Sequence, residues 1–175
     1  MKASLPRFFR AALACLLAGA VLFPGIASAA APKKAQAEVI YASPENFTDA
    51  RDPADKPAKE SPALARLRRH VENRARKVLP PGYRLVLTVT DVDLAGSYEP
   101  TTRRPRDVRV VREGHPPRID FAYTLTDATG ATVASGKETL REPGFLKRRY
   151  PNPNDDLRFE KAMLEEWLGR IAPKS

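Results

Sequence analysis

Three acidic residues near the end of an apolar segment are the first candidates for chemistry. Asp91 and Asp93 stand two residues apart, and Glu99 follows them. Side chains two positions apart in a strand project from the same face, so these two carboxylates should lie together. Such a group could ligate calcium, or its pKa values could be pushed apart for acid–base catalysis. It could equally cap the turn at 95–96 or pair with nearby arginines.

The basic residues indicate a different chemistry, the binding of anions. Arginine presents a planar set of donors that matches phosphate and carboxylate groups. The predicted anion-binding set is Arg103, Arg104, Arg106, Arg109, Arg112, Arg118, Lys147, Arg148 and Arg149. If the two segments that contain them meet at one end of the sheet, they form a single basic surface. The alternative is a solvated surface on which some arginines pair with the three acids.

Catalytic and metal-binding signatures are missing from the sequence. A nucleophile needs a base that orients it, but the two histidines, His70 and His115, stand in no recognisable arrangement with one. The sequence contains no Gly-x-Ser-x-Gly elbow, His-x-x-x-His pair or calcium-loop spacing. We therefore predict no catalytic residue, no metal ion and no cofactor, with the acidic residues as the alternative site.

The elements that position these residues are predicted from hydrophobic periodicity. Residues 83–92 have apolar side chains on both faces, which predicts a central strand covered on both sides. Residues 119–125 alternate strictly between apolar and polar, and 131–140 should return beside them as a hairpin. Residues 38–42 and 107–112 predict two shorter strands.

Two amphipathic helices complete the predicted domain. Ser61 and Pro62 are typical of a helix start, and the apolar stripe continues to Val78. A second helix should begin at Asn154 or Asp155, with apolar residues repeating every four positions. The order of elements predicts a single α+β domain over residues 38–175: an antiparallel sheet of about four to five strands with two helices packed on one face.

Five segments resemble one family of exported bacterial proteins. They are 46–49 (NFTD), 79–82 (LPPG), 89–96 (VTDVDLAG), 116–119 (PPRI) and 157–167 (LRFEKAMLEEW). The family is known as domain of unknown function 3016, and the resemblance covers residues 38–171. It implies a bacterial envelope protein and implies no activity, so no catalytic residue is carried over from it.

The first residues predict export. A basic start, an apolar run over 11–23 and small residues up to Ala29 form a cleavable signal peptide over 1–29, cut after Ala29. The run is too short to span a bilayer, and Cys15 lies too early in it for a lipoprotein anchor. Residues 30–37 should form a flexible tether. The sequence therefore predicts a periplasmic protein whose mature chain has no membrane span.

The composition narrows the choice of partners. The formal net charge is +9, and the chain lacks the mixture of basic and aromatic residues that stacks on nucleic-acid bases. We predict a non-catalytic accessory protein that binds an anionic envelope lipid or glycan, or an envelope protein, through its Arg-rich loop, and no nucleic acid. The alternative is a hydrolase or metal-dependent enzyme built on the acidic residues.

Overall fold

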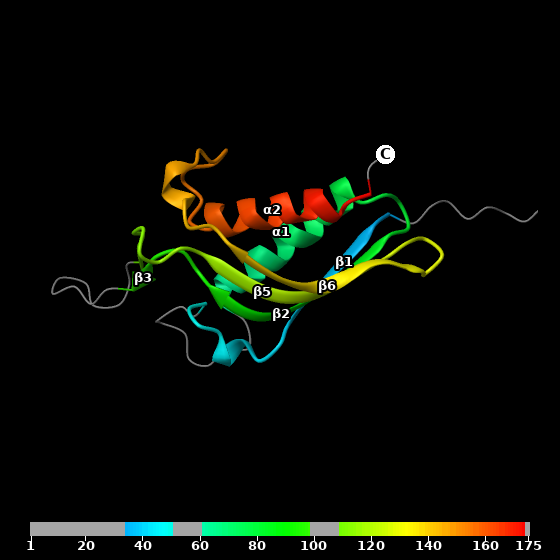
Figure 1. The fold of residues 1–175 in the computed structure, drawn as a ribbon, viewed down its shortest axis with the longest axis horizontal. Helices are drawn as coiled ribbons and strands as arrows, with labels where there is room; N and C mark the ends of the chain where they lie inside the picture. The colour runs from blue at the N-terminus through cyan, green and yellow to red at the C-terminus, as the bar shows by residue number, and fades with distance from the viewer. Residues whose placement is uncertain (1–33, 51–60, 99–108, 174–175) are drawn as a thin grey trace, which may run out of the picture. The chain divides into compact units, whose positions relative to one another are not determined.

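The computed structural model describes residues 34–50, 61–98 and 109–173 (Figure 1). The strands are β1 (Gln36–Tyr41), β2 (Arg84–Asp93), β3 (Ser97–Tyr98), β4 (Arg109–Val110), β5 (Arg118–Thr126) and β6 (Thr132–Arg141). The helices are α1 (Pro62–Val78) and α2 (Arg158–Ile171), with two short 3₁₀ turns, η1 (Pro44–Asn46) and η2 (Phe145–Lys147). β1 begins two residues before the strand predicted from Glu38, inside the segment expected to be a tether.

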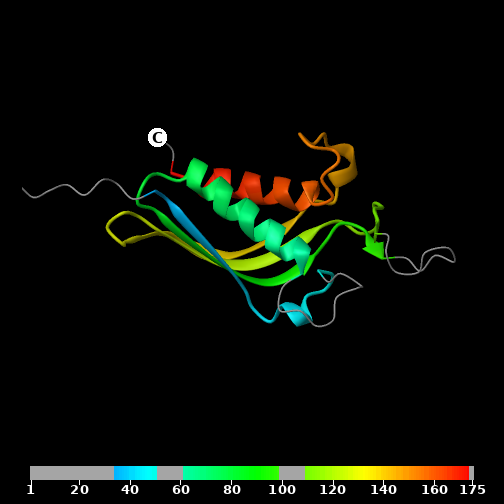
Figure 2. The ribbon, with the colours of Figure 1, turned by 180° about the vertical axis from the view of Figure 1, so that it is seen from behind.

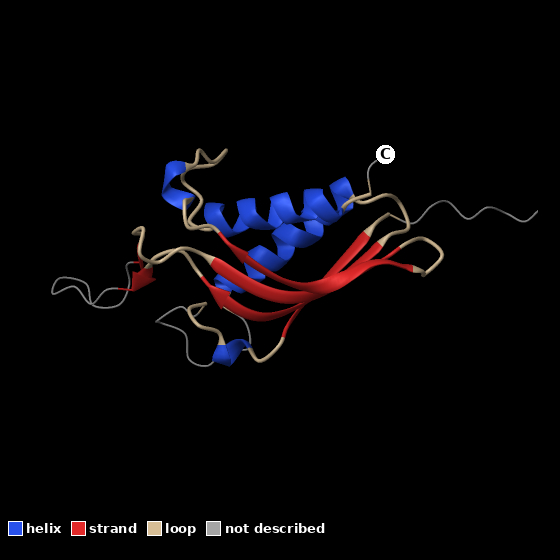
Figure 3. Cartoon of the chain, in the orientation of Figure 1, coloured by secondary structure: helices blue, strands red, loops and turns tan. Residues whose placement is uncertain are grey.

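Four strands form one sheet in the order β1-β2-β5-β6. Figure 3 shows this sheet in red, with the two long helices in blue on one side of it. β5 is antiparallel to both of its neighbours, but β1 pairs with β2 in parallel. The sheet is therefore mixed, whereas the sequence predicts an antiparallel one. The reason is the connection between β1 and β2, because it contains α1, and parallel neighbours need such a long crossover.

Both long helices pack on the same face of the sheet, as Figures 1 and 2 show from opposite sides. α1 buries Leu64, Leu67, Val71 and Ala75, and α2 buries Phe159, Met163, Leu164, Trp167 and Leu168. Trp167 is fully buried and meets the rings of Phe121 and Tyr123 edge-on, at centroid distances of 4.7 and 5.1 Å. The α+β class with two helices on one face is confirmed, although the helices cover one face of β2 rather than both.

A bulge in β2 decides which of its side chains enter the core. Leu85, Leu87 and Val89 are buried in alternation, and the register with β5 then shifts between Val89 and Asp91. Simple alternation would turn Asp91 toward the helices. Because of the bulge, Val92 is buried instead, with 1% of its surface exposed. Asp91 therefore projects from the opposite face of the sheet.

The helix ends show how far local signals reach. The Ser61 hydroxyl oxygen accepts the Leu64 N–H at 3.3 Å, so the predicted cap of α1 is confirmed. α2 begins at Arg158, later than predicted, because Asp155 accepts the Leu157 N–H at 3.0 Å in a turn before the helix. Neither helix, nor any other in the described ranges, is long and apolar enough to cross a membrane.

β3 and β4 form a small separate sheet beyond the end of β2. The predicted strand over 107–112 is therefore reduced, within the described residues, to a two-residue element outside the main sheet. Gly96, which precedes β3, has φ +79°, and a Cβ there would lie 2.3 Å from the carbonyl oxygen of Val110. Only glycine fits this turn without displacing β4.

Candidate functional site

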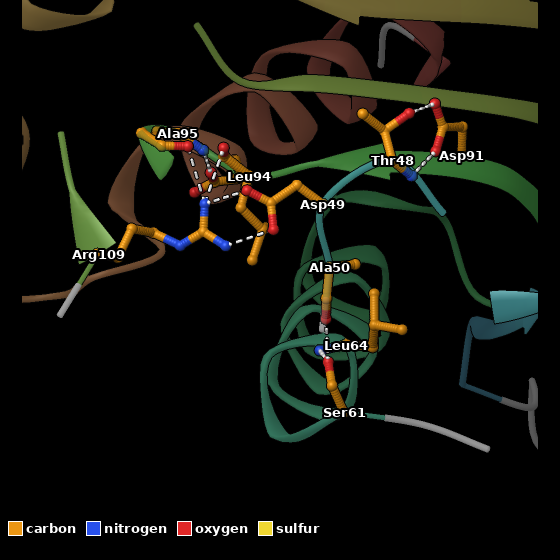
Figure 4. A network of polar contacts seen from close by, with 11 residues as sticks. Thr48, Asp49, Ala50, Ser61, Leu64, Asp91, Leu94, Ala95 and Arg109 are labelled. Atoms are coloured by element: carbon orange, nitrogen blue, oxygen red, sulfur yellow. Dashed lines mark hydrogen bonds and ion pairs between the residues drawn. The ribbon is translucent and has the colours of Figure 1, made fainter. Parts of the chain in front are cut away.

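The acidic and basic candidates meet where the end of β2 runs beside residues 47–50. Asp49 forms a parallel bridge with Asp93. The Asp49 N–H donates to Val92 O, and its own carbonyl accepts the Leu94 N–H, both at 3.0 Å. This segment therefore extends the sheet for a short distance, and Figure 4 shows the side-chain contacts that surround it.

Asp91 anchors this segment to β2. Its two carboxylate oxygens accept the Thr48 N–H and hydroxyl, each at 2.7 Å, and Arg118 forms an ion pair with it (Figure 4 shows the Thr48 contacts). Burial favours the neutral acid, but the two Thr48 bonds and Arg118 outweigh it, so the pKa of Asp91 lies below its ordinary value. Arg118 also bonds Asp120 at 2.7 Å. Asp91 is thus an ionised structural acceptor.

The pKa of Asp93 is shifted in the opposite direction from that of Asp91. Burial and repulsion from Asp49 raise the pKa of Asp93, so it is protonated more easily than Asp91. Glu99, the third member of the predicted acidic site, lies outside the described residues. Within the described ranges, no three acidic, histidine or cysteine side chains gather closely enough to hold a metal ion. The described part of the predicted acidic site therefore joins residues 47–50 to the end of β2 through polar contacts, and we call it the polar junction.

Replacing Asp91 with Asn should lower the free energy of unfolding by about 1–2 kcal/mol, because the amide cannot accept both Thr48 bonds and loses Arg118. The native pKa of Asp91 is depressed, so its contribution is present above the unfolded pKa and is lost as pH falls through the native value. Urea unfolding from neutral to acid pH should show the two proteins converging at acid pH. A difference that stays constant with pH would contradict this role.

Arg109 is the most connected cation of the site. Its side chain is 16% exposed and bonds Asp49 through two hydrogen bonds of 2.8 Å each. It also donates to the carbonyls of Gly96 at 2.9 Å and Leu94 at 3.3 Å (Figure 4 labels Arg109 and Leu94). The Arg109 guanidinium lies 4.5 Å from the ring centroid of Tyr98. Burial opposes the charge, but Asp49 outweighs it and raises the pKa of Arg109. Arg109 thus ties β4 to the end of β2.

The structure separates the predicted anion-binding residues into groups. Three are ion-paired: Arg109 with Asp49, Arg118 with Asp91 and Asp120, and Arg148 with Glu142 and Glu166. Arg112, Lys147 and Arg149 are exposed, and the last two form no ion pair with a described residue. Arg103, Arg104 and Arg106 lie outside the described residues. Sequence alone does not distinguish these groups.

Residues next to both predicted basic segments pack on one small buried cluster. Ala95, Phe145 and Phe159 form a small buried cluster, and Val111 and Tyr150 pack against it. Val111 follows β4 and Tyr150 follows η2, so both segments border this cluster. Figure 1 shows β3 and the η2 segment, coloured orange, at the same end of the sheet.

Glu160 in α2 is a buried acid that the sequence analysis did not identify. Glu160 is 0% exposed, and one carboxylate oxygen accepts the Ala95 N–H at 2.8 Å. The other oxygen is buried without a hydrogen-bond partner among the described residues. Burial raises the pKa of Glu160. Its neighbour Lys161 makes this part of the sequence look like a polar surface, and no local pattern marks the residue as buried.

The family of this chain can be identified by comparison with models of known protein families. A family model described as a protein of unknown function, DUF3016, matches residues 35–170. The chain belongs to this family. Of the segments that carried the resemblance, 46–49, 89–96 and 157–167 supply the contacts of Asp49, Asp91 and Glu160. These DUF3016 segments therefore build the junction described above.

No curated protein matches the chain. Similar solved structures include a PelC dodecamer from Paraburkholderia phytofirmans, with 11% identity, a TM-score of 0.41, and coverage of 82% of this chain and 92% of that chain. A single-residue variant of the same PelC dodecamer has 12% identity, a TM-score of 0.40, and coverage of 81% and 90%.

Proposed function

We propose that this DUF3016 protein is a non-catalytic protein of the bacterial envelope that binds an anionic lipid surface. The contact is made by the basic tip, which we define as residues 144–150. Here Leu146 is 43% exposed and stands beside the exposed cations Lys147 and Arg149. Cations attract lipid phosphates, and an apolar side chain between them can enter the boundary below the headgroups. This juxtaposition carries the proposal.

The basic tip is held in shape by its inward-facing residues. Phe145 is fully buried and packs on Phe159 at a centroid distance of 4.7 Å. The Tyr150 hydroxyl donates to the Phe145 carbonyl at 2.9 Å. Arg148 is ion-paired with Glu142, which fixes the stretch between them. The outward residues are therefore presented by a preformed loop, and binding loses little conformational entropy.

The expected affinity of one basic tip is weak. Each Lys or Arg near an anionic surface contributes about 1 kcal/mol, and burying the exposed part of Leu146 adds about 1 kcal/mol. The sum, about 3 kcal/mol, is below that of a single myristoyl chain, with K of about 10⁴ M⁻¹. The contact should therefore be reversible and should weaken as salt screens the charges.

Co-sedimentation with lipid vesicles tests this proposal. The unchanged protein should bind phosphatidylglycerol-rich vesicles at low salt and phosphatidylcholine vesicles much less. Lys147→Glu with Arg149→Glu should reduce binding by about tenfold or more, because two attractive contacts become repulsive. The matched control is Lys137→Glu with Arg170→Glu, which makes the same change of charge on β6 and at the far end of α2 (Figure 1).

Three results would contradict the proposal. The control variant could lose as much binding as the tip variant, which would reduce the effect to net charge. The unchanged protein could bind neutral and anionic vesicles equally, or could bind neither at low salt. The enzyme alternative has its own test, because an activity in the purified protein that disappears in Asp93→Asn, with folding unchanged, would establish it.

A further inference from the structure

A second group of cations lies around the first half of β1. Lys34 precedes β1, Arg76 is in the last turn of α1, and Arg84 begins β2. All three are exposed, and all three line one hollow of about 580 Å³. None of them belongs to the anion-binding set that the sequence predicts. Because they come from three separate parts of the chain, only the folded protein brings them to one place.

The hollow follows the outer edge of β1. Within the described ranges, β1 has a strand neighbour on one side only. Gln36 N–H donates to Tyr83 O at 2.9 Å, and successive residues of a strand turn their backbone groups to opposite sides. The N–H of Ala37, which lines the hollow, therefore points away from β2. The edge of a sheet can form a concavity that binds anions.

The cations retain donors that a ligand can use. A guanidinium group has five N–H donors. Arg84 donates to Glu38 and Arg76 donates to Asn73 through one nitrogen each, and their other N–H groups bond no described residue. Lys34 forms no ion pair with a described residue. The Arg84–Glu38 pair is about half exposed on both sides, and because such pairs contribute little free energy, Arg84 can exchange Glu38 for a ligand.

The lining of the hollow indicates the class of ligand. It contains the three cations and one acid, Glu38, so it attracts anions. Guanidinium groups match phosphate oxygens in geometry, and a ligand needs more than one charged group to contact several cations at once. Sites for organic molecules are lined mostly by apolar side chains, whereas the apolar side chains described here are only Ala35 and Ala37. The hollow therefore suits a small ligand whose surface is almost entirely charged.

We propose that this hollow binds a soluble oligophosphate, which is a compact anion with two or more adjacent phosphate groups. The phosphates lie along the edge of β1, where Arg76 of α1 and Arg84 of β2 reach them from two sides and Lys34 closes the end. The Ala37 N–H supplies a backbone donor between these cations.

This site is separate from the basic tip. Figures 1 and 2 show the start of β1 and the end of α1 at one end of the sheet, and η2 at the opposite end. The basic tip has the exposed Leu146, but the described lining of the hollow contains no large apolar side chain that could enter a bilayer. The two sites can therefore be occupied independently.

Isothermal titration calorimetry at low salt tests the proposal, with sodium orthophosphate, pyrophosphate and tripolyphosphate as the probes. Tripolyphosphate should bind about tenfold more tightly than orthophosphate, because a longer anion contacts more of the cations. Salt should weaken the binding by screening the charges. The proposal would be overturned if tripolyphosphate did not bind at millimolar concentration, or if it bound no more tightly than orthophosphate.

Two neighbouring substitutions in α1 locate the site. Arg76→Glu should weaken tripolyphosphate binding by about tenfold or more, because an attractive contact becomes repulsive. Lys77→Glu is the matched control, since Lys77 is the next residue, is exposed, and is not among the residues that line the hollow. Both variants make the same change of charge in the last turn of the helix. An equal loss of binding in the two would reduce the effect to net charge and overturn the proposal.

A gain of binding gives a test that does not depend on a damaged site. Glu38→Gln should strengthen tripolyphosphate binding by about threefold or more, because it removes the acid that competes for Arg84 and repels the ligand. Unchanged or weaker binding would count against the placement of the ligand at this edge.

The variant of the basic tip distinguishes this proposal from the previous one. Lys147→Glu with Arg149→Glu should bind tripolyphosphate as the unchanged protein does, although it loses vesicle binding. If this variant lost tripolyphosphate binding while Arg76→Glu retained it, the oligophosphate site would be wrong, and the result for vesicles would stand by itself.

Discussion

Replacing Arg109 with Leu lowers the free energy of unfolding by about 2–4 kcal/mol, which we expect to be among the largest effects of a single polar substitution in this protein. The Arg109–Asp49 pair is partly buried, with side chains 16% and 27% exposed, and removing one partner of such a pair leaves the other charge uncompensated. Here Asp49 would lose both of its 2.8 Å hydrogen bonds while remaining beside Asp93. The carbonyl of Gly96 would also lose a donor. Urea unfolding at neutral pH measures this change.

A double-mutant cycle separates the pair from the packing of the arginine stem. Asp49→Asn combined with Arg109→Leu should cost less than the two single changes added together, with a coupling energy of about 1–3 kcal/mol. The matched control is Arg84→Leu, whose ion pair with Glu38 is about half exposed on both sides and contributes less than about 1 kcal/mol. If Arg109→Leu were no more destabilising than Arg84→Leu, the junction would not depend on Arg109.

Glu160→Gln should stabilise the protein at neutral pH by about 1–3 kcal/mol, because it replaces an acid whose ionisation is opposed by burial and whose second oxygen has no partner among the described residues. The amide oxygen can still accept the Ala95 N–H. Since the native pKa of Glu160 is raised above its unfolded value, the wild-type penalty is absent below the unfolded pKa and grows as pH rises toward the native pKa.

Urea unfolding of both proteins across this pH range checks the sign. The advantage of Glu160→Gln should be present at neutral pH and should disappear at acid pH, where the carboxyl is neutral in both states. Glu160→Ala is the contrasting variant, and it should lower stability by about 2–4 kcal/mol because the Ala95 N–H loses its acceptor and a cavity forms. A Gln variant less stable than wild type at neutral pH would contradict this account.

Local signals in the sequence predicted local structure well. Ser61 and Pro62 act within one turn of α1, so their residue types suffice to place its start. The start of α2 was predicted too early because Asp155 caps a turn rather than the helix. Strand order depends on which strands pair with each other, and the hydrophobic periodicity of a single strand does not indicate its partner. The parallel pairing of β1 therefore appeared only in the structure.

The polar junction could not be predicted from residue patterns either, because its contacts join residues that are far apart in the sequence. Arg109 bonds Asp49, 60 positions away, and Glu160 bonds Ala95, 65 positions away. The bulge in β2 leaves no mark in the alternation of residue types, yet it decides that Asp91 faces away from the helices. In the same way, paired and exposed arginines look alike in the sequence until their acidic partners are located.

The central claim is that the basic tip enters an anionic lipid surface, and a fluorophore placed on the tip tests it most directly. An environment-sensitive label is attached at Leu146→Cys in the Cys15→Ser background, with Val133→Cys, equally exposed on β6, as the control. On adding phosphatidylglycerol vesicles at low salt, the label at position 146 should shift to the blue and brighten, and salt should reverse the change. An unchanged spectrum at position 146, or the same shift at position 133, would contradict the account.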